Sequence, residues 1–268
     1  MIDWHTHILP GIDDGSADMQ QSLAMAAALV AFGFQTVYCT PHRMVGCYEA
    51  SNDRVLQGVA GLQEQLDKSG IPLRLLPGRE YCLDEYLPAA MEDPLPLGDS
   101  RLILIEIPPW ITPEMVRRLL YDVVRAGFTP VIAHPERCRL LEPVVRRSAG
   151  RGLLGTFKDL FTGGYRDRRQ VPDTATTTGN PQLDYLRDLG CSFQGNLGSF
   201  SGFYGRQVKA TAELMKSLGL YDCYGSDLHA PEQVGMILGQ GQKRDFSHGQ
   251  MQALPSDSPK VGASKRQK

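Results

Sequence analysis

The sequence predicts an α/β protein built around a parallel sheet, and three observations support this class. Short apolar runs alternate with helix-like segments about seven times along the chain. Residues 101–105 form a continuous apolar run of the kind that is buried on both faces of a sheet. At 268 residues the chain is long enough for one large core or for two small domains. The alternation therefore indicates a parallel sheet that is either closed as a barrel or doubly wound.

Each expected element has a local signal. We place strands, from β-rich runs that end at turns or polar residues, at residues 2–4, 35–39, 72–76, 101–105, 130–133, 192–194 and 222–225. Ser16 or Asp18 can cap the first helix, which stops at Gly33, and Thr112 can cap another that begins with Pro113. We place helices at about residues 18–32, 52–69, 84–91, 113–126, 184–189 and 205–218.

Composition and charge exclude several classes. The apolar fraction of 42% and the charged fraction of 22% are typical of a soluble globular protein. The net charge of −2 argues against nucleic acid as a bulk electrostatic partner. The most apolar run, residues 23–34, is too short for a membrane span and follows acidic residues, unlike a signal peptide. We therefore expect a buried helix there and a cytoplasmic protein.

The six cysteines are scattered and form no C-x-x-C pair, so we expect reduced and mostly buried thiols. A cysteine-dependent tyrosine phosphatase needs an arginine six residues after its nucleophilic cysteine, to hold the phosphate. None of the six cysteines has an arginine at that offset. The sequence therefore excludes that chemistry.

Potential metal ligands follow the ends of the expected strands. His5 and His7 follow the first strand, and alternate residues of an extended chain point the same way. Other polar residues of the same kind follow it or later strands: Asp14, His42, Glu80, Glu106, His134, Asp227 and His229. In a β/α barrel these strand ends converge on one rim. Five of the six histidines belong to this set.

This residue set favours phosphoester chemistry. Five imidazoles and four carboxylates are too many for one four-coordinate ion, and they suit two or three ions with a bridging carboxylate. Nitrogen and oxygen ligands without thiolate favour manganese, iron or zinc. Arg137, three residues after His134, is placed to bind phosphate oxygens through two parallel hydrogen bonds. Metal ions beside an arginine indicate phosphoester hydrolysis more than amide hydrolysis.

Seven short motifs occur in one order along about residues 1–240. They are His5-Thr-His7, Asp13-Asp14-Gly15, Thr40-Pro41-His42, Gly78-Arg79-Glu80, Ile105-Glu106, Ala133-His134-Pro135-Glu136-Arg137 and Ser226-Asp227-Leu228-His229. This series resembles a PHP (polymerase and histidinol phosphatase) domain. The first fifteen residues are more specifically similar to the bacterial PHP-type tyrosine phosphatases of capsular and extracellular polysaccharide loci.

The resemblance implies a distorted seven-stranded (β/α) barrel of PHP type, with a trinuclear metal site at the C-terminal ends of the strands. The metal is usually manganese, with iron or zinc as alternatives. By this resemblance His5, His7, Glu80 and Asp227 would hold one ion, Glu80, Glu106 and His134 a second, and Asp14, His42 and His229 a third. A metal-bridging hydroxide would attack phosphorus in line.

The resemblance also implies functional roles and a partner. Arg137, Asp14 and His42 would be catalytic, and Arg137 would also bind the phosphoryl group. Arg206 would be a second phosphate contact, although a solvated arginine at a helix start is an alternative. The substrate would be phosphotyrosine in the tyrosine-rich C-terminal tail of a membrane-associated tyrosine autokinase, in capsule or exopolysaccharide biosynthesis. Neither nucleic acid nor a membrane span is expected, and the oligomeric state is not predicted.

The chain departs from the family in two segments, one inside an expected PHP phosphatase domain at 1–240 and one after it. A basic insertion at about 142–180 makes the chain roughly thirty residues longer than expected. It is interpreted either as a surface loop or as a basic lid or docking surface for an acidic or phosphorylated partner. Residues 241–268 are rich in Gln, Lys and Ser without apolar periodicity, which predicts a disordered tail.

Two alternative functions stay open. One is a small-molecule PHP phosphatase such as histidinol phosphatase, and the other is a non-catalytic PHP scaffold that binds the kinase or metal. The opening residues 8–15 favour the protein phosphatase over the small-molecule enzyme. The presence of every expected ligand disfavours the scaffold.

Overall fold

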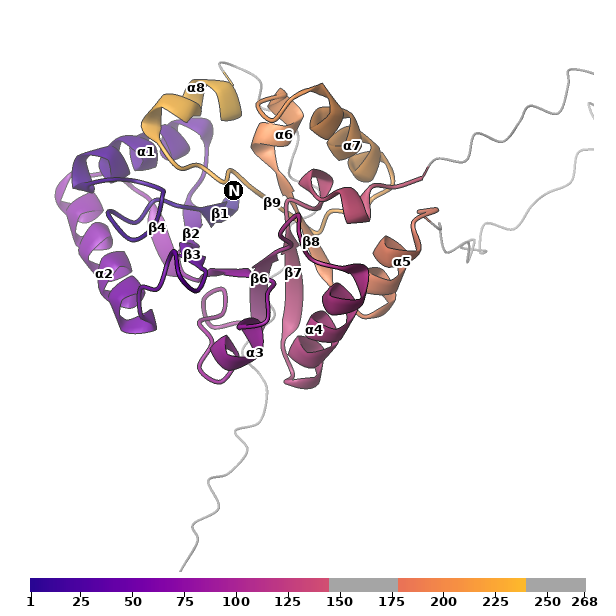
Figure 1. Cartoon of the computed structure of the whole chain (residues 1–268). Helices are drawn as coiled ribbons and strands as arrows, with labels where there is room; N and C mark the ends of the chain where they lie inside the picture. The colour runs from indigo at the N-terminus through magenta and orange to yellow at the C-terminus, as the bar shows by residue number, and fades with distance from the viewer. Residues whose placement is uncertain (145–177, 240–268) are drawn as a thin grey trace, which may run out of the picture.

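The protein has a mixed α/β fold whose parallel sheet is curled into a half-barrel, with helices on the outside (Figure 1). The computed structural model describes residues 1–144 and 178–239. The predicted tail, and residues 145–177 of the predicted basic insertion, lie outside the described residues. The predicted α/β class and parallel sheet are confirmed.

The elements follow the predicted alternation. The strands are β1 (Ile2–Thr6), β2 (Thr36–Cys39), β3 (His42–Arg43), β4 (Arg74–Pro77), β5 (Glu80–Cys82), β6 (Leu102–Glu106), β7 (Thr129–Ala133), β8 (Ser192–Asn196) and β9 (Cys223–Gly225). The α-helices are α1 (Met19–Phe32), α2 (Asn52–Lys68), α3 (Leu87–Ala90), α4 (Pro113–Arg125), α5 (Pro181–Asp188), α6 (Leu197–Ser201), α7 (Arg206–Ser217) and α8 (Val234–Ile237). Three 3₁₀ turns complete the order in the described part of the chain, η1 (Pro135–Arg137), η2 (Arg139–Leu141) and η3 (Pro231–Gln233).

The strands form two sheets in which every pairing is parallel. One sheet has the order β1-β2-β4, and the other has the order β3-β5-β6-β7-β8-β9. Only Thr40 and Pro41 separate β2 from β3, and only Gly78 and Arg79 separate β4 from β5. The chain therefore passes twice from the three-stranded sheet directly into the six-stranded sheet, from β2 to β3 and from β4 to β5.

The two sheets also meet where β1 lies beside β9. Thr6 forms a parallel bridge with Leu228. The His7 amide donates to the Leu228 carbonyl at 3.1 Å, and the Asp227 amide donates to the His5 carbonyl at 2.7 Å. We call this junction of residues 5–7 with 227–228 the seam. It joins the first and last strands at the ends that carry the predicted ligands.

A register shift in the pairing of β1 with β2 changes the face to which the later side chains of β1 point. Asp3 lies opposite Val37, but Thr6 lies opposite Cys39, so β1 holds one residue more than β2 over this stretch. Such a bulge changes the face to which the following side chains point. Trp4 packs in an apolar cluster with Tyr38 and Leu104, and its ring stacks on Tyr38 with centroids 4.8 Å apart.

Helix caps agree with the predicted ones. Asp18 accepts a hydrogen bond from the Gln21 amide at the start of α1, and Gly33 ends that helix at φ 115°. Thr112 caps α4, with Pro113 in its first turn. No helix within the described ranges combines the length and apolar character needed to cross a membrane. All six cysteines are free thiols, and four of them are buried.

Candidate metal centre

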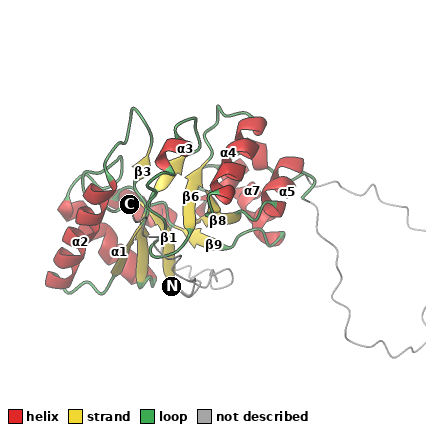
Figure 2. Cartoon of the chain, turned by 90° about the horizontal axis from the view of Figure 1, so that it is seen from below, coloured by secondary structure: helices red, strands yellow, loops and turns green. Residues whose placement is uncertain are grey.

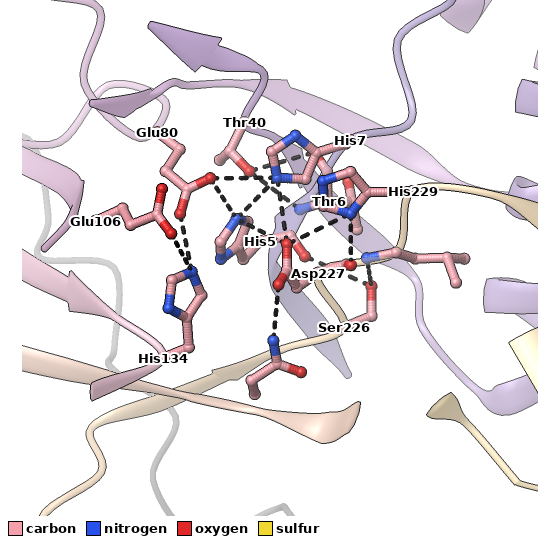
Figure 3. Close-up of polar contacts among 12 residues, drawn as sticks. His5, Thr6, His7, Thr40, Glu80, Glu106, His134, Ser226, Asp227 and His229 are labelled. Carbon is pink, nitrogen blue, oxygen red and sulfur yellow. Dashed lines mark hydrogen bonds and ion pairs between the residues drawn. The ribbon is translucent and has the colours of Figure 1, made fainter. Parts of the chain in front are cut away.

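The nine predicted metal ligands gather in one cluster, and Figure 3 labels all of them except Asp14 and His42. They come from β1, β3, β5 and β6 and from the segments that follow β1, β7 and β9: His5, His7, Asp14, His42, Glu80, Glu106, His134, Asp227 and His229. Figure 2 shows β3 at the end of the molecule opposite the N-terminus of the chain. The convergence inferred from strand ends is therefore what the fold produces.

Glu80 lies at the middle of the cluster. Its Oε2 is 3.2 Å from His5 Nε2, 3.3 Å from His7 Nε2 and 3.0 Å from His42 Nδ1. Its Oε1 is 3.0 Å from His134 Nε2. Oε2 is fully buried and accepts no hydrogen bond from the described residues. A buried carboxylate oxygen without a hydrogen bond, surrounded by imidazole nitrogens, is the environment of a metal ligand.

Asp227 faces the same imidazoles from the other side. Its Oδ1 is 3.4 Å from His5 Nε2, 3.3 Å from His7 Nε2 and 3.6 Å from His229 Nδ1. The Nε2 atoms of His5 and His7 are only 3.0 Å apart. Two imidazole nitrogens and two carboxylate oxygens therefore converge on one point, which suits a shared cation.

The other oxygen of Asp227 is held by three donors. Arg137 Nη1 donates to Oδ2 at 2.9 Å, Asn196 Nδ2 at 2.8 Å and the Tyr204 hydroxyl at 3.2 Å. The Arg137 guanidinium lies over the Tyr204 ring, with Cζ 4.4 Å from the centroid. These contacts fix both the carboxylate and the arginine before any substrate arrives.

The remaining ligands extend the cluster toward solvent. Asp14 Oδ1 is 3.6 Å from His42 Nε2 and 3.7 Å from His229 Nε2. The Asp14 side chain is 47% exposed, whereas that of Glu80 is 1% exposed. Glu106 Oε1 lies 3.9 Å from His134 Nε2. The centre therefore runs from a closed base at Glu80 to an open side at Asp14.

Two further side chains orient the histidines, and the sequence did not assign them a role. Asp13 Oδ2 is 2.7 Å from His7 Nδ1, and Gln194 Oε1 is 2.9 Å from His5 Nδ1. Asp13 also accepts from the His42 amide at 2.9 Å. Partners of this kind fix the ring orientation and leave Nε2 free for a metal. Asp13 lies within a quoted motif, but Gln194 carries no comparable sequence signal.

Burial and charge set the protonation of the cluster. Burial alone would raise the pKa of Glu80, but the charges of His5 and His42 hold that pKa well below its usual range. Burial alone would lower the pKa of His5, but the charges of Glu80 and Asp227 outweigh burial and raise it to about 9. The Glu80 carboxylate is therefore ionised at neutral pH and attracts positive charge.

Two of the predicted ligands lie in strained backbone. His134 has φ 32° and Asp227 has φ 52°, and no other non-glycine residue within the described ranges has a positive φ. This left-handed conformation costs a non-glycine residue about 1–3 kcal/mol, and it clusters at functional sites. The strain indicates that the position of these side chains is selected for chemistry.

The donor set fits divalent ions. Three overlapping groups bring their donor atoms close enough together to share an ion: His7, Asp14, His42 and His229; His5, His7 and Glu80; and His42, Glu80 and Glu106. All donors are imidazole nitrogens or carboxylate oxygens. This chemistry suits manganese, iron or zinc.

The two predicted phosphate contacts differ in their positions. Arg137 belongs to η1 and lies at the centre, with its side chain 33% exposed. Arg206 is the first residue of α7 and is exposed. Among the described residues, no hydrogen bond or ion pair joins Arg206 to the centre. The structure therefore brings Arg137, but not Arg206, into contact with the predicted ligands.

The chain is similar in sequence to known proteins. The chain is 33% identical over 232 residues to the tyrosine-protein phosphatase YwqE of Bacillus subtilis, covering 85% of this chain and 77% of that protein. It is 31% identical over 144 residues to the tyrosine-protein phosphatase CpsB of Streptococcus pneumoniae, covering 53% of this chain and 59% of that protein.

A solved structure is also similar. It is described as one of the crystal structures of YwqE from Bacillus subtilis and CpsB from Streptococcus pneumoniae, unique metal-dependent tyrosine phosphatases. The TM-score is 0.68 at 29% identity, and the superposition covers 92% of this chain and 89% of that one. Residues 1–149 match the family described as capsular polysaccharide synthesis, CpsB/CapC. With its metal-ligand cluster and these relatives, the chain belongs to the CpsB/CapC family.

Proposed function

We propose that this protein is a metal-dependent protein-tyrosine phosphatase that hydrolyses phosphotyrosine on a bacterial tyrosine autokinase during capsule or exopolysaccharide synthesis. The observation that carries the proposal is the buried histidine–carboxylate cluster with Arg137 held at its side. The printed names of the relatives support the same reaction. Phosphotyrosine is a dense anion attached to a ring, and this cluster concentrates the positive charge that such a group requires.

The nine clustered residues would hold three divalent ions, with manganese as the first candidate. When bound, such ions neutralise phosphoryl charge and lower the pKa of water at the site. Glu80 would bridge two ions, because its two oxygens face different imidazoles. Asp13 and Gln194 would hold His7 and His5 in the ligating orientation.

Arg137 would bind the phosphoryl oxygens. One of its nitrogens is occupied by Asp227, and its stack on Tyr204 keeps the guanidinium plane fixed. The other donors of the planar group remain for two oxygens of a phosphate. Asp14 and His42 lie at the open side of the cluster, where a phenolate leaving group would depart and take up the proton that the attacking water gives up. Arg206 would contribute a second, more distant positive charge.

The surroundings of the cluster favour a polypeptide substrate over histidinol phosphate. Seven large apolar side chains are exposed within the described ranges, and five of them lie outside α2 and α4, in segments that come after β3, β5, β6, β7 or β9. These five are Val45, Tyr86, Trp110, Val144 and Met236. An enzyme for a small polar metabolite gains nothing from an exposed apolar rim, whereas a protein substrate covers such a rim when it binds.

We also propose that the two sheets together form the closed seven-stranded barrel that the family resemblance implies. If the β2–β3 and β4–β5 paths count as one strand each and the seam closes the circle, the sheet becomes a distorted barrel of seven strands. The bridge between Thr6 and Leu228 supports that closure. We extend the same proposal to a phosphatase domain over residues 1–240 and to a cytoplasmic site of action, on the cytoplasmic tail of the kinase.

The test is phosphate release by the manganese-loaded protein from a phosphotyrosine peptide and from histidinol phosphate, each with a chelator control. Chelator-sensitive release from the peptide is expected. Release from histidinol phosphate alone would establish the small-molecule enzyme instead. Metal binding without release from either compound would favour the non-catalytic scaffold.

Two variants separate the paired hydrogen bonds of Arg137 from its positive charge. Arg137→Ala should lower kcat/KM for the peptide about 10²–10³-fold, because an oriented charge at the phosphoryl group is lost. Arg137→Lys should recover only part of that loss, since a lysine cannot form two parallel hydrogen bonds. Circular dichroism should show that both variants remain folded. Wild-type turnover by Arg137→Ala would contradict the assigned role.

A further inference from the structure

Two adjoining pockets form a groove beside the metal centre. They share Arg43, Tyr81, Ala89 and Ala90 and have volumes of about 160 and 310 Å³. We call them together the α3 groove. Its walls are the segment that follows β3 and the segment from β5 through α3, and Figure 2 shows β3 and α3 at the same end of the molecule.

Two residues that line the α3 groove are neighbours of predicted ligands in the sequence. Arg43 directly follows His42, and Tyr81 directly follows Glu80. Cys82, which lines the smaller pocket, lies opposite Glu106 in the pairing of β5 with β6. Neighbouring side chains of a strand point to opposite faces, so Arg43 and Tyr81 face away from His42 and Glu80. Val45 and Asp84, in the segments that follow β3 and β5, also line the smaller pocket, so the groove opens a few residues from the ligands along both segments.

The smaller pocket has the size and chemistry for one apolar side chain. Its volume of about 160 Å³ is close to that of a protein cavity that takes a benzene ring. Val45 and Tyr86 border it, with exposures of 41% and 50%. Leu87 and Ala90 add further apolar wall. Apolar surface this exposed beside a reactive centre is covered when a partner binds.

The larger pocket is polar and suits a peptide backbone. Asn52, Glu92 and Asp93 line it together with the shared Arg43. Among the described residues, no carboxylate lies within ion-pair distance of the Arg43 guanidinium, so its donors are available to peptide carbonyl groups. An extended peptide rises about 3.3 Å per residue, and its alternate side chains point to one face.

We propose that the α3 groove binds the polypeptide on one side of the phosphotyrosine, with an apolar residue in the smaller pocket and the backbone continuing through the larger one. This inference rests on the proposed function and names the substrate more closely. It makes the enzyme selective for phosphotyrosines that have a leucine or an aromatic residue nearby. A small aryl phosphate gains nothing from the groove.

The substitution Ala89→Trp tests the groove by filling it. Ala89 lines both pockets and is exposed on α3, so a larger side chain there needs no change in the core. Glu85→Trp is the matched control, because Glu85 is exposed in the same segment but lines neither pocket. A second variant, Tyr86→Ser, removes an apolar border without filling the groove.

The substrates are two phosphotyrosine peptides, one flanked by leucine and one by glycine on both sides, and p-nitrophenyl phosphate. The manganese-loaded wild-type protein should prefer the leucine peptide about tenfold in kcat/KM, mainly through KM. Ala89→Trp should abolish this preference, Tyr86→Ser should reduce it, and all variants should keep p-nitrophenyl phosphate turnover within about twofold. Glu85→Trp should behave as wild type.

Equal use of the two peptides by the wild-type protein would overturn the proposal, as would a preference that survives Ala89→Trp. Fluorescence anisotropy with labelled versions of both peptides provides a readout that does not need turnover. Absence of turnover on every substrate would contradict the proposed function alone. A leucine preference in binding that Ala89→Trp removes would then still support the groove, and equal binding would still overturn it.

Discussion

The two carboxylate oxygens of Asp227 contact two different groups of side chains. Oδ1 faces the imidazoles of His5 and His7, while Oδ2 accepts hydrogen bonds from Arg137 and Tyr204. One carboxylate therefore couples the metal cluster to the proposed phosphate-binding arginine. Asn196 adds a third donor at Oδ2, so the orientation of this side chain is over-determined.

Substitutions of Tyr204 should separate ring stacking from hydrogen bonding. Tyr204→Phe keeps the ring under Arg137 and loses the bond to Asp227, so KM for an aryl phosphate should change less than about twofold. Tyr204→Leu loses both contacts, and KM should rise about 5–10-fold with a smaller change in kcat. The measurement is steady-state kinetics of the manganese-loaded variants. An equal loss of metal content and kcat in both variants would instead indicate a purely structural tyrosine.

The residues of the cluster were more predictable from the sequence than the side chains that orient them. Every predicted ligand follows the end of a strand expected from the sequence, and a parallel fold brings such positions together. In the structure His42 and Glu80 are the first residues of the short strands β3 and β5. Gln194 is different, because its contact with His5 spans 189 residues and depends on which face each strand presents. Its amide resembles any other polar residue in the sequence. Contacts between side chains of distant strands can be found only from the fold.

At the scale of elements, the longer helices were predictable and the shortest strands were not. The cap at Asp18 and the glycine stop at Gly33 are local signals, and α1 lies between them. β3 has two residues and β5 has three, which is too short for any alternation to be seen. The bulge in β1 was equally hidden, since a register shift is a property of a pair of strands.

The connection between β1 and α1 depends on Gly15. A Cβ atom at this position would lie 2.1 Å from the His7 carbonyl oxygen, which also accepts the Ser16 amide. Gly15→Ala should therefore lower the free energy of unfolding by about 1–3 kcal/mol and weaken metal binding, because His7 must move. Urea unfolding and metal content after dialysis measure the two effects.

Gly61→Ala is the control for that substitution. Gly61 lies inside α2, and nothing lies within 4 Å of the Cβ that alanine would add. This change should raise the free energy of unfolding by up to about 1 kcal/mol, because alanine favours a helix more than glycine does. A loss of stability at Gly61 equal to that at Gly15 would contradict the steric explanation.

At the scale of the whole molecule, the metal cluster lies across the two sheets. His5 belongs to the three-stranded sheet, whereas Glu80 and Glu106 belong to the six-stranded one. Ions bound between them would join parts of the chain that are otherwise connected through the seam and the two strand paths. The proposed ions would therefore contribute to stability as well as to chemistry.

Metal removal should lower the melting temperature. An ion that binds only the folded protein adds about 2.7 kcal/mol at one hundred times its Kd, which shifts Tm by about 5–10 °C for a chain of this size. Scanning calorimetry with excess manganese and with a chelator measures the shift. Glu80→Gln should show almost no shift, because the central carboxylate charge is lost; an unchanged shift in that variant would contradict the role of Glu80.

The seam has a consequence for the motion of the chain. Its amide hydrogens at His7 and Asp227 are bonded to carbonyl groups of the opposite strand, and the backbone of two predicted ligands thereby closes the junction. Local opening of β1 from β9 would expose both amides to solvent at once and pull His5 and Asp227 apart. Deuterium uptake at these two amides should therefore report, at a single junction, both the integrity of the sheet and the occupancy of the metal centre.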